Sequence, residues 1–228
     1  MPAPEASAKA LNYVEKALAI DDGLPEAYAT LGWIRLNECN GPAAATAFEK
    51  AIQLNDRYLP AYQWYASYCN VVGNSERAAV LLRKALEIDS VSDYTKTISA
   101  WQLVRPAPEE AANILDSVLQ SRPDFALAHY VRGYCAMAMN QADAAVRSLE
   151  TAVQIPGGQP FYLSGLAQAY AKAGRREDAL RTIQRLESGV ELGSMETVSL
   201  AEAFLELGDK ERCCQILERY LVQHGGIP

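Results

Sequence analysis

Several features that enzymes and metalloproteins rely on are scarce or absent in this 228-residue sequence. It contains two histidines, His129 and His224, and neither lies in a recognisable pattern with a Ser or Cys nucleophile. No Gly-rich phosphate loop is recognised, because no strand pattern is present to precede one. The five cysteines include no Cys-x-x-Cys pair, so a zinc site is not expected. We therefore expect a protein that is not an enzyme and binds neither a metal nor a cofactor.

Positive charge and long apolar runs are also lacking. The net charge is −7, and no basic stripe is available to neutralise phosphates, which argues against nucleic-acid binding. No apolar run approaches the roughly 20 residues of a membrane span, and residues 1–10 have no secretory-signal pattern. The scattered, odd set of cysteines favours a reducing compartment. These features predict a cytoplasmic location, or a periplasmic one if a membrane span lies upstream.

Small residues recur with a period of 34 residues, interrupted by one step of 33. One column of such residues is Ala10, Ala44, Ala78, Ala111, Ala145, Ala179 and Cys213. A second column, expected inside the preceding helix of each unit, is Gly32, Ala66, Ala100, Gly133, Ala167 and Ala201. Glycines that can end the first helix with a positive φ stand at Gly73, Gly174 and Gly208. Columns in one register indicate a repeated helix–turn–helix unit.

The first full unit resembles the tetratricopeptide repeat. Tyr28, Leu31–Gly32, Ala44, Phe48 and Ala51 match its pattern of aromatic, Leu-Gly, small and large residues. The resemblance implies an all-α fold, an α-α superhelix of about six and a half repeats that spans residues 1–228. The expected units are a half repeat at 5–22 and full repeats at 25–58, 59–92, 93–125, 126–159, 160–193 and 194–228.

Three places in this series depart from the regular repeat. The half repeat matches a second helix without its first, which predicts a piece cut from a longer protein; the alternative is a native half repeat that acts as a cap. The third repeat is one residue short at Pro106–Pro108. The stretch from Pro156 to Pro160 is a candidate hinge.

The resemblance places the first helix of each unit on a concave face. Helical spacing and the tryptophans predict a partner-binding groove formed by Trp33, Asn37, Gln63, Trp64, Ser67, Asn70, Trp101, Arg105, Tyr130, Tyr134 and Met137. Such an aromatic groove suits an apolar peptide or a helix of a partner domain. The alternative is that the rings pack between neighbouring units. The cationic clamp that some tetratricopeptide co-chaperones use for a carboxylate is missing, since Ala29, Trp33 and Trp64 occupy its places.

Two functions follow. The first is a protein-interaction scaffold for a peptide or partner domain. The second rests on runs such as 31–36 and 166–180, which resemble the C-terminal repeats of bacterial winged-helix transcription regulators of the CadC or HilA type and of class III adenylate cyclases. In that case the chain is a sensory or regulatory signalling module. It would act by intramolecular docking or as a homodimer through apolar edges near Ala10–Ala17 and at Cys214, Leu221 and Val222.

Overall fold

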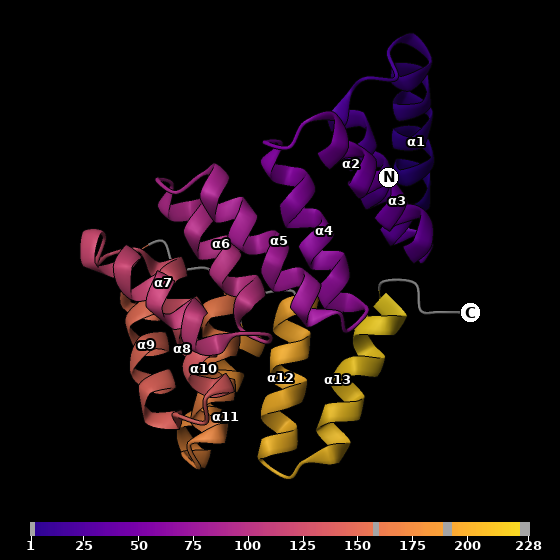
Figure 1. Ribbon diagram of the computed structural model, residues 1–228. Coiled ribbons are helices and arrows are strands. Elements are labelled where there is room, and N and C mark those ends of the chain that lie inside the picture. Colours follow the sequence, from indigo (N-terminus) through magenta and orange to yellow (C-terminus); the bar gives the residue numbers. More distant parts are fainter. Residues whose placement is uncertain (1–2, 157–159, 189–192, 224–228) are drawn as a thin grey trace. The chain divides into compact units, whose positions relative to one another are not determined.

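The spacing of small and apolar residues produces helices throughout the part of the chain that is described. The computed structural model describes residues 3–156, 160–188 and 193–223, and it contains no strand within them. The helices are α1 (Ala3–Ile20), α2 (Pro25–Asn37), α3 (Gly41–Leu54), α4 (Leu59–Val71), α5 (Ser75–Ile88), α6 (Asp93–Leu103), α7 (Pro108–Ser121), α8 (Ala126–Ala138), α9 (Ala142–Gln154), α10 (Pro160–Lys172), α11 (Arg176–Glu187), α12 (Ser194–Glu206) and α13 (Lys210–Gln223). The all-α fold predicted from the sequence is confirmed (Figure 1).

The helices form two compact units, residues 1–107 and residues 108–228. In the first unit α2 pairs with α3 and α4 with α5, and α4 also contacts α2 and α6. In the second unit α8 pairs with α9, α10 with α11 and α12 with α13, and α10 also contacts α8 and α12. The division falls in the shortened third repeat. Of the predicted hinge, residues 157–159 lie outside the described residues.

Small residues in the first helices make room for a large side chain of the second helix. A Cβ added to Gly32 would lie 2.6 Å from Cε1 of Phe48, and one added to Gly133 would lie 2.5 Å from Cγ of Leu149. Both distances are under 3.0 Å, so the side chain of Phe48 or Leu149 would have to shift to admit a Cβ at these glycines. Both large side chains are completely buried. Alanines of the other small-residue column are also fully buried at Ala44, Ala78, Ala111, Ala145 and Ala179.

Polar caps stabilise the N-terminal ends of several helices, and residues in the left-handed conformation follow the C-terminal ends of others. Asn40, Asn74 and Ser92 accept hydrogen bonds from backbone N–H groups of the first turns of α3, α5 and α6. Gly73, Gly174 and Gly208 have φ values of 78°, 73° and 77°, as the sequence predicted. Cys39 and Asn140 take the same left-handed conformation, both with φ of 58°. The sequence prediction did not include these two, because neither is a glycine.

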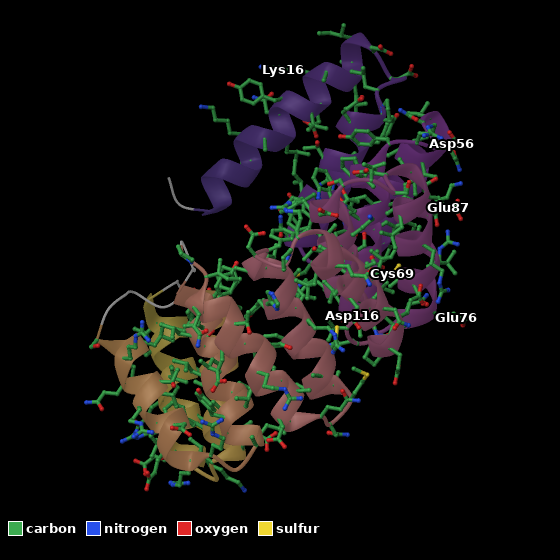
Figure 2. All side chains as sticks on the ribbon, turned by 90° about the vertical axis from the view of Figure 1, so that its left-hand side faces the viewer. Lys16, Asp56, Cys69, Glu76, Glu87 and Asp116 are labelled. Carbon is green, nitrogen blue, oxygen red and sulfur yellow. The ribbon has the colours of Figure 1, made fainter. Side chains whose placement is uncertain are left out.

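Charged side chains lie on the outside of both units. Asp56, Glu76 and Glu87 are exposed along one edge of the first unit (Figure 2). Arg132 on α8 donates to Asp116 on α7 at 2.8 Å in the second unit. Such exposed pairs contribute about 0–1 kcal/mol each, so apolar packing dominates the stability of the repeats.

Candidate functional site

The most exposed tryptophan is Trp33, which lies on α2 of the first unit. Its side chain is 40% exposed, and its ring centroid lies 5.8 Å from that of Trp64 on α4. Trp64 is half-buried and also packs on a cluster of three fully buried alanines, Ala29, Ala51 and Ala61. One tryptophan is therefore anchored in the core, and it supports the other at the surface.

Asn37 and Ser67 lie one turn from these rings on the same helices, and Gln63 immediately precedes Trp64. Asn37 follows Trp33 by four residues on α2 and is exposed. Gln63 and Ser67, four residues apart on α4, are half-buried. The helices α2 and α4 contact each other, and so do the two rings; we call the predicted groove residues on these helices the tryptophan face: Trp33, Asn37, Gln63, Trp64 and Ser67. It offers aromatic area together with carboxamide and hydroxyl groups.

The other predicted residues of the first unit have more varied surroundings. Asn70 is half-buried, and its Nδ2 donates to the backbone oxygen of Gln102 at 3.0 Å, which ties α4 to α6. Trp101 on α6 is half-buried. Arg105 is exposed, but it lies in the turn after α6 rather than on the helix where its spacing placed it, because α6 ends at Leu103. Asn70 therefore has a structural contact of its own.

The predicted groove residues of the second unit require a correction. Tyr130 and Met137 are only 1% and 4% exposed, so they are core residues and offer no surface to a partner. The Tyr130 ring lies 5.0 Å from Phe161 and 5.2 Å from Tyr162, since α10 packs on this face of α8. Tyr134 is half-buried, and its hydroxyl shares a 2.9 Å hydrogen bond with the hydroxyl of Ser199 on α12. Burial raises the pKa of both tyrosines.

A recurring Tyr–Glu–Arg arrangement, which the sequence prediction missed, links neighbouring repeats. Tyr65 donates to Glu49 at 2.7 Å, and Tyr170 donates to Glu150 at 2.7 Å. An arginine lies over each ring, at 5.7 Å for Tyr65 and 4.5 Å for Tyr170. Burial, followed by the hydrogen bond to the carboxylate, raises the pKa of both phenols to about 12. The arrangement is a structural tie between repeats.

The histidine and cysteine side chains form no metal-binding cluster in the described ranges. His129 is half-buried and its Nε2 lies 2.9 Å from the backbone oxygen of Pro123. Cys69, Cys135 and Cys213 are buried, as expected of structural thiols. Cys39 is exposed, and so is Cys214, which the sequence analysis placed at an apolar edge. His224 lies outside the described residues.

Among the described residues, no helix combines the length and apolar character needed to cross a bilayer.

Comparison with known proteins identifies the repeat. Family models described as tetratricopeptide repeat match residues 160–185 and 199–226. Superkiller protein 3 of Schizosaccharomyces pombe is 25% identical over 195 residues, which is 78% of this chain but 14% of that protein.

Solved structures give the same result for the fold. A tetratricopeptide repeat protein from Parabacteroides merdae has 16% identity and a TM-score of 0.74, and the match covers 96% of this chain and 87% of that one. YrrB, described as a TPR protein with an unusual peptide-binding site, has 17% identity and a TM-score of 0.53, with 87% and 97% covered. At these identities the similarity concerns the fold alone.

Proposed function

We propose that this tetratricopeptide repeat protein is a non-enzymatic interaction scaffold, and that the tryptophan face of its first unit binds an extended peptide. The repeat fold itself supports a role in protein–protein interaction. The similarity to YrrB, a protein described as having a peptide-binding site, is in line with a peptide ligand for this chain.

The observation that carries the proposal is the exposure of Trp33 beside Trp64. Two indole rings 5.8 Å apart, one of them 40% exposed, present a large and rigid apolar area. Tryptophan is enriched among the residues that dominate binding energies, because it gives much contact area for few rotatable bonds. An apolar side chain of the peptide would pack on the rings.

The polar residues of the tryptophan face would recognise the peptide backbone. Asn37, Gln63 and Ser67 supply both hydrogen-bond donors and acceptors, and none of them is charged. A neutral rim accepts an extended backbone, whose N–H and C=O groups must be paired when water is removed. We therefore expect ligands with an apolar anchor and no requirement for a terminal carboxylate.

The test is selection of peptides from a random phage-displayed library on the purified protein, followed by titration of the selected peptides. Trp33→Ala should weaken binding by about 2 kcal/mol or more, the usual cost of truncating a central aromatic. Tyr94→Ala is the matched control, because Tyr94 lies on α6 of the same unit and is 62% exposed. If Trp33→Ala binds as tightly as the control while its circular dichroism is unchanged, the proposed site is wrong.

A further inference from the structure

Glu26 lies on the same side of α2 as Trp33. The two residues are seven positions apart in the helix. Because seven residues make almost two full turns, the side chains project from one face, about 10 Å apart along the helix axis. Glu26 is exposed, and within the described part of the chain its carboxylate forms no ion pair and accepts no hydrogen bond. Its charge is therefore available to a ligand that contacts Trp33.

A cluster of aromatic side chains connects Glu26 with the tryptophan face. Ala29, which lies between Glu26 and Trp33 on α2, belongs to the buried alanine cluster on which Trp64 and Tyr58 both pack. Burial raises the pKa of the half-buried Tyr58 phenol, and the nearby Glu26 carboxylate raises it further. The aromatic surface of the tryptophan face thus continues toward a carboxylate.

The other charges of α1 to α4 leave this region net negative. Arg35, the only basic residue of α2, lies in the last turn of that helix and is paired with Glu38 at 2.8 Å. Helix α4 contains no charged residue. Arg57, in the connection to α4, follows Asp56, and over residues 3–71 acidic side chains outnumber basic ones by eight to five. Electrostatic complementarity therefore favours a basic ligand over an acidic one.

The helix itself also benefits from an acidic residue at this place. A carboxylate in the first turn of a helix is stabilised by the partial positive charge of the helix N-terminus. Glu76 occupies the first turn of α5 in the same unit and is exposed like Glu26, but α5 is not one of the helices of the tryptophan face. Glu76 is therefore a matched control, which separates an effect on binding from an effect on the helix.

We propose that the peptide ligand of the tryptophan face carries a Lys or Arg about three residues from its apolar anchor, and that the Glu26 carboxylate binds this basic group. This proposal rests on the proposed function of the tryptophan face. An extended chain covers about 10 Å in roughly three residues, which is the separation of Glu26 and Trp33 along α2. The aliphatic part of Lys or Arg can pack on the aromatic rings while its charge reaches the carboxylate.

The experiment uses the peptides selected on the purified protein in the test of the proposed function. The tightest of them is titrated with its basic residue intact and with that residue replaced by Glu. In the natural protein this replacement should weaken binding about tenfold, because an attraction becomes a repulsion. In Glu26→Lys the preference should be reversed, so that the glutamate peptide binds more tightly than the basic one. Glu76→Lys changes the net charge by the same amount and should keep the natural preference.

A milder variant covers the case in which Glu26→Lys does not fold, as judged by circular dichroism. Glu26→Gln keeps the size of the side chain and should weaken only the basic peptide, by about threefold. A purely structural role of Glu26 would instead weaken both peptides alike.

The outcomes separate this proposal from the proposed function. The role of Glu26 is overturned if the selected peptides lack the basic residue, or if the Glu26 variants keep the same peptide preference as Glu76→Lys. The proposed function survives either result when Trp33→Ala still abolishes binding of the selected peptides. Peptides whose binding does not depend on Trp33 overturn both.

Discussion

The close crossing of α8 and α9 predicts that Gly133→Ala destabilises the natural protein but stabilises a protein that carries Leu149→Ala. Gly133 lies so near Leu149 that an added Cβ would be 2.5, 2.9 and 3.2 Å from Cγ, Cδ1 and Cδ2 of that leucine. All three atoms belong to the part of Leu149 that an alanine lacks. Gly133→Ala should therefore clash in the natural protein and fit in a Leu149→Ala background.

The magnitudes follow from two opposing effects. Overpacking a core costs about 1–3 kcal/mol, whereas Gly→Ala inside a helix gains up to about 1 kcal/mol. In the natural protein the net effect of Gly133→Ala is thus a loss of up to about 3 kcal/mol. Leu149→Ala alone should cost about 2–5 kcal/mol, because Leu149 is fully buried. In that background the clash is gone, and Gly133→Ala should stabilise by up to about 1 kcal/mol.

The assay is urea unfolding followed by circular dichroism for the four proteins of the cycle. Gly174→Ala is the control, since its φ is 73° and no atom lies within 4 Å of its added Cβ. That change should destabilise through the backbone alone, equally in both backgrounds. The packing explanation is refuted if Gly133→Ala changes the free energy of unfolding equally in the natural protein and in Leu149→Ala, within the roughly 0.5 kcal/mol expected of independent sites.

Three further predictions concern pH, a helix end and thiol reactivity. The pKa of Tyr65 and of Tyr170 is about 12 in the folded protein and 10.0 ordinarily, so the unfolded chain loses these two protons first as the pH rises. The free energy of unfolding should therefore be unaffected below pH 10 and should fall between pH 10 and 12. Replacement of both tyrosines by Phe should remove that part of the dependence of the unfolding free energy on pH. Cys39→Gly should raise the free energy of unfolding by up to about 1 kcal/mol, because glycine adopts the φ of 58° without strain; a loss in urea unfolding would contradict this. The exposed thiols of Cys39 and Cys214 should react with a thiol reagent in the native protein. The thiol of Cys135 should stay unreactive, because it is buried and because burial raises its pKa to about 12. Mass spectrometry of peptides from the labelled protein identifies which cysteines have reacted.

Some conclusions from the sequence stay predictions. The resemblance to the repeats of winged-helix regulators and adenylate cyclases, homodimer formation, and the choice between cytoplasm and periplasm are of this kind. They depend on partners or on segments that the repeat pattern does not encode.

The sequence alone determined the repeat and its helices. Small residues at a fixed period, such as Ala44 and Gly133, are required wherever two helices cross closely, so the requirement is visible in the amino acids themselves. Glycines that end helices are visible for the same reason, because few other residues take a positive φ without strain. The sequence also showed that the third repeat is one residue short at Pro106–Pro108, although its candidate hinge was Pro156–Pro160 and it did not predict the division between the two units that falls at residue 107.

Only the tertiary structure decided which side chains are available to a partner. Helical spacing put Tyr130, Met137 and Trp33 at equivalent places of their helices, but the first two are 1% and 4% exposed within the second unit, whereas Trp33 is 40% exposed in the first. Leu149 and Leu217 are the same residue at the same repeat position, yet one is fully buried and the other 38% exposed. Exposure depends on the neighbouring helix rather than on the residue, and a pattern within one helix carries no information about what lies against it.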